Sequence, residues 1–176
     1  CSKKKNEIFQ ILNKLKRQRL TQKIGLSGYN LNNVTKIIKR FNFDILQFPY
    51  NLFDQRINDK KFLNLLRKKN IELHIRSIFL QGIFLLNYKK LPYYFNKWRK
   101  SFSKLDEIIT KKNINILNLS FSHAFNLKYH NKKIIFGIKS LKQINEIKDI
   151  VILKNLKFFK NIKNHDKKLI LPYLWK

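Results

Sequence analysis

Several residue types that mark particular protein classes are scarce in this sequence. Its 176 residues include only 4 glycines, 3 prolines and 1 cysteine. So few glycines and prolines exclude a collagen-like or Gly/Pro-rich chain, and one cysteine excludes a disulfide scaffold. No apolar run approaches the ~18 residues of a membrane span. The longest run, residues 78–86, is interrupted by Gln81 and Gly82, so we expect no membrane-spanning segment.

Methionine is absent altogether, and the first residue is Cys1. Two interpretations are open: a truncated reading frame, and a processed lipoprotein whose mature end is Cys1. We favour truncation, because the sequence carries no signal segment that would support the lipoprotein.

What the chain does contain predicts a folded, strongly basic protein. Hydrophobic residues make up 44% and aromatic residues 14%, which is too apolar for a disordered chain. There are 39 Lys and Arg against 10 Asp and Glu, a net charge of +29, which raises a polyanion as a partner. However, Lys, Asn and Ile all have A/T-only codons, and the basic residues run evenly from Lys3 to Lys176. We therefore interpret the charge mainly as compositional drift on a solvated surface and only secondarily as a binding surface for a polyanion, so a nucleic-acid partner is not favoured.

Hydrophobic spacing predicts short strands that alternate with helices. The predicted strands are residues 23–27, 43–49, 71–77 and 133–137. The predicted helices are residues 7–20, a segment from 30–32 to Phe41, and residues 59–69, 102–112, 116–128 and 140–153, with 78–98 and the C-terminal tail irregular. This alternation indicates one α/β domain, or a piece of one, with a parallel sheet and right-handed crossovers.

Polar side chains stand at the C-terminal ends of the predicted strands, the edge where α/β sheets bind ligands. They are Ser27, Gln47, Arg76 with Ser77, and Lys139 with Ser140. Neither common glycine-rich phosphate loop occurs in the sequence.

Four sequence blocks in the order KIGLSGYN, FDILQFPYNLFD, IELHIRSIFLQG and IIFGIKSLKQINEI carry a resemblance to a known family. The chain resembles the second half of an aldo/keto reductase, and most resembles the bacterial subgroup near polysaccharide and spore-coat biosynthesis genes. The likeness covers residues 8–157 and leaves 158–176 as a C-terminal tail. It implies an α/β fold: the C-terminal half of a (β/α)8 TIM barrel, with family strands five to eight. The family's catalytic Asp, Tyr, Lys and His lie on the first four strands, and no block here matches them.

The resemblance also implies a site for NADP or NAD, with NADP slightly favoured. Ser27 and Gln47 match residues that hold the nicotinamide carboxamide. A glutamine offers both a donor and an acceptor to such a group. The family often has Asn where this chain has Gly28, so one contact differs.

Two further blocks match the loops that enclose the rest of the dinucleotide. Ser77, Phe79 and Gln81 match positions near the pyrophosphate and ribose, and Arg76 replaces an aromatic residue that commonly stacks on the nicotinamide. After the fourth strand, the positions near the adenosine 2′-phosphate and adenine are matched by Gly137, Lys139, Ser140 and Gln143. Lys139 would favour a 2′-phosphate. Ile147 stands where the family pattern has Asn.

These residues imply an NAD(P)H-dependent oxidoreductase that reduces carbonyls or oxidises alcohols on a small carbonyl or sugar-like substrate. Because the catalytic half is unmatched, we expect no turnover from residues 1–176 alone. The alternative is a basic, non-enzymatic α/β module that binds nucleic acid or another polyanion. We expect no metal site, since the histidines show no ligand spacing with Cys or carboxylates, and a cytoplasmic location, since one cysteine suits a reducing compartment.

Two structural expectations complete the sequence-based interpretation. His74 could be an acid/base group, but we favour a barrel-interior histidine that is hydrogen-bonded to its neighbours. Half a barrel would also leave two open sheet edges and one exposed apolar face. On that ground we expect the isolated chain to be insoluble, molten or dimerised.

Overall fold

The computed structural model describes residues 2–154 and 157–175. Its centre is a four-stranded parallel sheet of β1 (Gly25–Ser27), β2 (Ile45–Pro49), β3 (Glu72–Arg76) and β4 (Lys132–Ile134). The strands lie in chain order β1-β2-β3-β4, and each pairs in parallel with the next. Successive parallel neighbours are the arrangement of a TIM barrel, so the expected α/β fold with a parallel sheet is confirmed.

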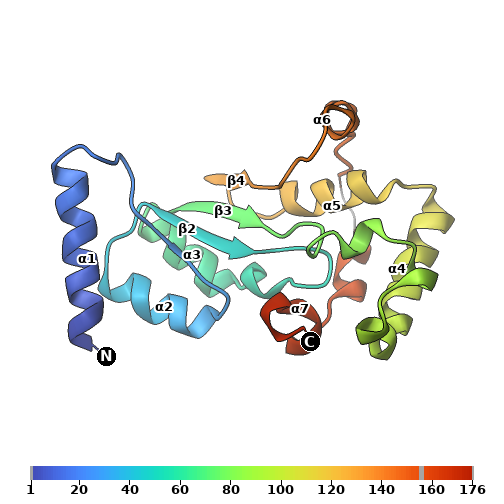
Figure 1. Ribbon diagram of the computed structural model, residues 1–176, viewed down its shortest axis with the longest axis horizontal. Helices are drawn as coiled ribbons and strands as arrows, with labels where there is room; N and C mark the ends of the chain where they lie inside the picture. The colour runs from blue at the N-terminus through green and yellow to red at the C-terminus, as the bar shows by residue number, and fades with distance from the viewer. Residues whose placement is uncertain (1, 155–156, 176) are drawn as a thin grey trace.

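Helices connect these strands and continue beyond them (Figure 1). The α-helices are α1 (Ser2–Arg17), α2 (Leu31–Arg40), α3 (Lys60–Lys68), α4 (Arg99–Lys112), α5 (Ile116–Phe125), α6 (Leu141–Lys148) and α7 (Lys167–Ile170). Short 3₁₀ helices are η1 (Arg56–Asn58), η2 (Ile83–Leu85), η3 (Tyr88–Lys90), η4 (Tyr93–Trp98), η5 (Lys157–Ile162) and η6 (Pro172–Leu174). The Asn30 side chain caps α2, because it accepts a hydrogen bond from the Asn33 amide.

The fourth strand and the helix after it are shorter than predicted. β4 ends at Ile134, although the Ile135 amide still donates to the Ile75 carbonyl at 2.7 Å. The ladder stops there because β3 itself ends at Arg76, and Ser77 takes a left-handed backbone with φ of 58°. α6 ends at Lys148, and none of its residues is fully buried, so little packing extends it.

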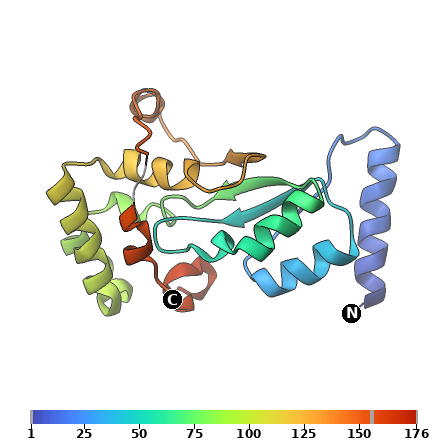
Figure 2. The same cartoon turned by 180° about the vertical axis from the view of Figure 1, so that it is seen from behind.

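One face of the sheet packs against helices. Leu46, Phe48, Leu73 and Ile75 are completely buried, and one hydrophobic cluster joins them to residues of α2, α3 and α5. Figure 2 shows α2 and α3 lying across this face. Because side chains alternate along a strand, the neighbouring residues point to the other face.

That other face, here called the open face, is lined mainly by polar side chains. Its polar members are Ser27, Gln47, Glu72, His74, Arg76 and Lys133, and the register places Ile45 and Pro49 of β2 on the same face. The expectation of an exposed apolar face is therefore wrong. The strands are too short and too apolar for the alternation of polar and apolar side chains to be recognised in the sequence. The register shows it, because Ser27, Gln47, His74 and Lys133 lie in one row across the four strands.

A second hydrophobic cluster fills the space beyond the C-terminal ends of the strands. It joins Phe53 to η2, η4, α4 and α7 through residues such as Phe84, Trp98, Phe102 and Leu169. The C-terminal tail is tied to this cluster by the Tyr94 hydroxyl, which donates to the Lys168 carbonyl at 2.8 Å. Among the described helices, none is long and apolar enough to cross a membrane.

Candidate functional site

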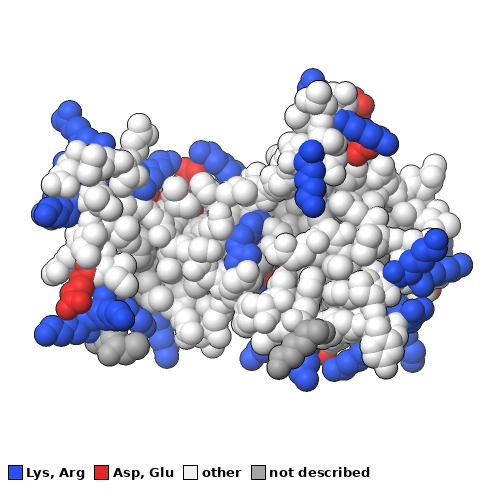
Figure 3. Space-filling view, in the orientation of Figure 1, with Lys and Arg blue, Asp and Glu red and all other residues white. Residues whose placement is uncertain are grey.

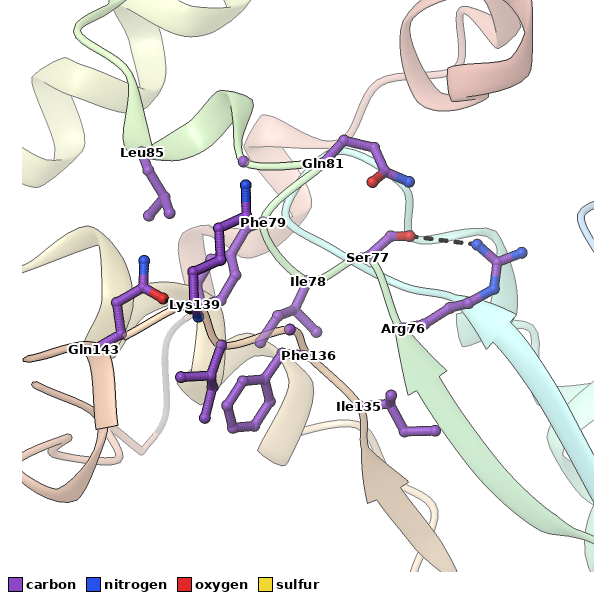
Figure 4. A pocket seen from close by; sticks show the side chains of 13 residues that line it. Arg76, Ser77, Ile78, Phe79, Gln81, Leu85, Ile135, Phe136, Lys139 and Gln143 are labelled. Atoms are coloured by element: carbon purple, nitrogen blue, oxygen red, sulfur yellow. Dashed lines mark hydrogen bonds between the residues drawn. The ribbon is translucent and has the colours of Figure 1, made fainter. Parts of the chain in front are cut away.

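A groove of about 790 Å³ opens at the C-terminal edge of the sheet. It lies between the loop that follows β3 and the segment that follows β4, whose side chains face each other across it (Figure 4). Seven of the ten residues predicted to bind the cofactor line this groove: Arg76, Ser77, Phe79, Gln81, Gly137, Lys139 and Gln143. The size falls within the usual range for ligand pockets.

The loop after β3 has a strained backbone. Ser77, Leu80 and Gln81 have φ of 58°, 48° and 56°, and Gly82 has φ of 86°. Left-handed conformations are costly for residues other than glycine, and they persist where surrounding structure enforces them. Here the Leu80 side chain is fully buried in the second hydrophobic cluster, which holds the loop in this shape.

Asn51 also holds this loop, and the sequence analysis did not single it out. Its side-chain amide donates to the Ser77 carbonyl at 3.1 Å, and its side-chain oxygen accepts from the amides of Phe53 and Asp54. Asn51 is buried at the end of β2. Its position two residues after Pro49, where β2 ends, was the only available signal, and it could not reveal the partner 26 residues away.

Aromatic side chains form an apolar floor beside the groove. The ring of Phe121, on α5, packs edge-on against Phe79 at 5.6 Å and against Phe136 at 5.0 Å. Phe79 and Phe136 each line the groove. Phe79 therefore has a packing role that joins the two walls, in addition to lining the groove.

On the opposite wall, Ser140 and Gln143 cap α6. The Ser140 hydroxyl accepts from the Gln143 amide at 3.3 Å, while the Gln143 side-chain oxygen accepts from the Lys139 amide at 2.7 Å. This reciprocal arrangement resembles a capping box, and it directs the start of α6 toward the groove. Ser140 itself is not among the lining residues, whereas the Lys139 side chain points into the groove (Figure 4).

Arg76 stands at the sheet end of the groove and is held by neutral groups. Its Cζ lies 4.1 Å from the ring centroid of Tyr29, a cation–π contact. Its guanidinium also donates to the Ser77 hydroxyl at 3.3 Å and to the Gly28 carbonyl at 3.5 Å. Tyr29, which we had not placed in the binding site, thus supports a predicted site residue.

Ser27 and Gln47 do not line the groove. They sit side by side on β1 and β2, where the Ser27 hydroxyl lies 3.5 Å from Gln47 Oε1. Both belong to the open face, one pleat before the position of Arg76 on the neighbouring strand β3. The structure brings them to the same face and edge of the sheet as Arg76, but outside the groove.

Farther from that edge, Glu72 of β3 connects β4 and the segment before β1 on the open face. Its carboxylate pairs with Lys23, with Lys133 at 2.9 Å and with His74 Nε2 at 2.6 Å. Hydrogen bonds from Lys23, His74 and Lys133 lower the pKa of Glu72 from 4.5 to about 2. His74 is thus hydrogen-bonded to a neighbour, which confirms the interpretation favoured from the sequence.

His123, on α5, is buried without a hydrogen bond of good geometry to either ring nitrogen. Its ring stacks on Tyr50 at 4.4 Å and meets Phe159 edge-on at 4.5 Å. Burial lowers the pKa of His123 from 6.5 to about 3. The residue is therefore neutral at physiological pH, and the sequence offered no sign of its burial because it is flanked by serine and alanine.

The charge of the groove suits an anionic ligand. Arg76 and Lys139 contribute positive charge, and none of the described residues that line the groove is acidic. Within residues 2–154 and 157–175, no cluster of His, Cys, Asp and Glu side chains is arranged to hold a metal ion. The walls thus combine cationic and hydroxyl or amide groups with an aromatic floor, a lining that fits a phosphate-bearing ligand with flat rings.

The chain combines a parallel α/β sheet with a groove at the C-terminal edge of its strands, the edge where such folds bind ligands. The aldo/keto reductase family model matches residues 1–167, and the chain belongs to the aldo/keto reductase family. The family resemblance inferred from the four sequence blocks is therefore confirmed. No curated protein sequence matches the chain.

Solved structures show the same fold at low sequence identity. Aldo-keto reductase AKR11C1 from Bacillus halodurans, in its apo form, is 16% identical, with a TM-score of 0.69 over 97% of this chain and 57% of that one. The glycerol dehydrogenase AKR11B4 from Gluconobacter oxydans is 16% identical, with a TM-score of 0.62 over 92% of this chain and 53% of that one. The chain thus spans a little over half the length of the structures it matches.

Proposed function

We propose that this chain is the cofactor-binding part of an NAD(P)H-dependent oxidoreductase of the aldo/keto reductase type. The observation that carries the proposal is the groove at the C-terminal edge of the parallel sheet, with Arg76 and Lys139 and no acidic residue among its described lining. The chain belongs to the aldo/keto reductase family. In barrel enzymes, ligands bind at the C-terminal ends of the strands, which is the edge where this groove lies.

Different residues along the groove are proposed to bind different parts of the dinucleotide. Lys139 and Gln143 are proposed to face the adenosine phosphate, and the loop of Ser77, Phe79 and Gln81 the pyrophosphate and ribose. Gly137 would leave room beside them. The N-terminus of α6, which Ser140 caps, adds a partial positive charge that favours phosphate.

At the sheet end, Ser27 and Gln47 are proposed to hold the carboxamide of the nicotinamide. Their contact at 3.5 Å already places a hydroxyl and an amide side by side. A bound nicotinamide supplies the hydride, while the protein orients the ring and excludes water. NADP is slightly favoured over NAD because of Lys139.

The proton chemistry is proposed to lie elsewhere in the barrel. We assign this chain to family strands five to eight, in line with its coverage of 57% of AKR11C1. The catalytic Asp, Tyr, Lys and His of the first four strands have no counterpart here, so residues 1–176 alone are expected to bind a dinucleotide without turning over a carbonyl. The substrate would be a small carbonyl or sugar-like molecule, and the location cytoplasmic.

Titration with NADPH tests the proposal. The purified chain should bind NADPH, and Lys139→Gln should weaken binding by about tenfold, since charged hydrogen bonds contribute about 1.5–3 kcal/mol. Lys142→Gln removes the same charge from the exposed side of α6 and should change binding less than twofold. If NADPH does not bind, or if the two variants are equally impaired, the groove is not the nucleotide site.

The alternative function, a basic module for polyanions, rests on the net charge of +29. Lys and Arg side chains are spread over the face in Figure 3 instead of forming one stripe. Salt dependence separates the two proposals, because affinity for nucleic acid falls steeply as salt rises. Retention of duplex DNA or RNA at ~150 mM salt would favour the module.

A further inference from the structure

Arg76 places an uncompensated positive charge at the sheet end of the groove. A guanidinium remains protonated at all physiological pH values. Arg56, nearby in the fold, is neutralised by two hydrogen bonds of 2.7 Å to the Asp54 carboxylate. Among the described residues, Arg76 has a hydroxyl and a carbonyl as its hydrogen-bond acceptors and the Tyr29 ring as its cation–π partner, and no carboxylate forms an ion pair with it.

The position of this charge is held by a chain of contacts. Arg56 donates from Nη1 to the Tyr29 carbonyl at 2.6 Å, which anchors the backbone of Tyr29. The Tyr29 ring is further supported edge-on by Tyr173 at 5.0 Å, and its face carries the Arg76 guanidinium. Because the arginine is held on one side by this ring and on the other by Ser77, its charge is a fixed feature of the site.

The two redox forms of a nicotinamide differ in charge. The oxidised ring is a cation and the reduced ring is neutral, while the phosphates of the two forms are the same. A fixed positive charge near the ring therefore repels the oxidised form selectively. Lys139, at the far wall, is proposed to face the phosphates that both forms share, and it would not discriminate between the two forms.

We propose that Arg76 makes the groove select the reduced nucleotide over the oxidised one. This inference rests on the proposed function and deepens it: the site loads NADPH, releases NADP⁺ readily, and so favours carbonyl reduction over alcohol oxidation. At an effective dielectric constant of about 40, between the values for a protein surface and for bulk water, and a separation of about 6 Å, the repulsion corresponds to roughly tenfold in affinity.

Calorimetric titration of the purified 176-residue chain with NADPH and with NADP⁺ tests this selection. Wild type should bind NADPH about tenfold more tightly than NADP⁺. Arg76→Gln should bring the two affinities to within about twofold, and Arg76→Lys should keep most of the preference because it keeps the charge. Arg17→Gln, an exposed position on α1 away from the groove, should leave the ratio unchanged.

A second measurement does not depend on the variants. Raising the salt concentration from about 0.05 M to about 1 M should reduce the wild-type preference, because salt screens a partly exposed charge. Thermal unfolding followed by circular dichroism confirms that each variant is folded before it is titrated.

The outcomes separate the inference from the proposed function. If both nucleotides bind and the ratio is near one, or is the same in wild type and folded Arg76→Gln, the selection by Arg76 is wrong while the cofactor site stands. If neither nucleotide binds to wild type, the proposed function is wrong and the inference falls with it.

Discussion

The guanidinium of Arg76 lies over the ring of Tyr29, with Cζ 4.1 Å from the ring centroid. This contact joins the end of β3 to the loop between β1 and α2, and Tyr173 continues it to the C-terminal tail. Three segments that are distant in the sequence therefore meet at the sheet end of the groove. The contact places a positive charge at a position where the resemblance to the family implies an aromatic residue.

The contact between Arg76 and Tyr29 should be measurable as a coupling energy. A double-mutant cycle with Tyr29→Leu and Arg76→Gln is expected to give about 0.5–1 kcal/mol, the usual size of a partly exposed cation–π contact. Urea unfolding of the four proteins provides the free energies. Tyr93→Leu, at a ring that is 87% exposed, should show no coupling to Arg76→Gln. Additive effects within error for the Tyr29 pair would show that the stack contributes nothing.

Glu72→Gln should destabilise the open face of the sheet. The variant loses charge-assisted hydrogen bonds to Lys23, His74 and Lys133, each about 1.5–3 kcal/mol at most, and the exposed lysines reduce the total. We expect a loss of about 1–3 kcal/mol at pH 7, measured by urea unfolding. Glu107→Gln, at an exposed position of α4, should change stability by less than ~0.5 kcal/mol.

The stabilisation by Glu72 should also depend on pH. Its pKa is lowered from 4.5 to about 2 in the folded chain, so the unfolded chain binds the proton first as pH falls. The contribution is complete above the unfolded pKa and disappears as pH falls from about 4.5 toward 2. The difference in unfolding free energy between wild type and Glu72→Gln should therefore shrink over this interval. A difference that stays constant down to pH 2 would contradict the proposed ion network.

His123 should make the chain sensitive to acid in a different interval. Burial lowers its pKa from 6.5 to about 3, so protonation favours the unfolded state. Stability is unaffected above 6.5 and declines as pH falls toward 3, by at most about 1.4 kcal/mol per pH unit. His123→Phe keeps the stacking on Tyr50 and removes the titrating group, so its stability should decline less between pH 6.5 and 4.5, above the range of Glu72. His165→Phe, at an exposed position in the C-terminal tail, is the control, and its stability should change with pH as that of wild type does.

Asn51→Ala should loosen the strained loop of the groove. The substitution removes the donor to the Ser77 carbonyl and the acceptor of two backbone amides, all buried. We expect a loss of about 2–3 kcal/mol in the free energy of unfolding, and faster amide exchange at residues 77–82 than in wild type. Urea unfolding gives the first quantity, and hydrogen exchange read by mass spectrometry gives the second. Asn58→Ala, at an exposed side chain of η1, should leave exchange in this loop unchanged.

Local sequence signals identified most of the elements. Asn30, Asp59 and Ser140 are good helix caps, and each starts a helix in the structure, because capping depends on residues only three apart. The strands were found from short apolar runs, but their ends were not, since the length of β4 depends on where β3 bends away at Ser77. Irregular residues 78–98 contain η2, η3 and η4, whose shape depends on burial of Leu80, Phe95 and Trp98 in the second cluster.

The family, the parallel α/β fold and seven of the groove residues could be found from the sequence by itself, because the four blocks combine residue type with spacing. Only the tertiary structure decided that Asn51 holds Ser77, that Tyr29 carries Arg76 and that His123 is buried. It also showed that the open face is polar and that Ser27 and Gln47 stand outside the groove. These facts depend on contacts between residues 20 or more positions apart, which strand register and packing create and which no local pattern encodes.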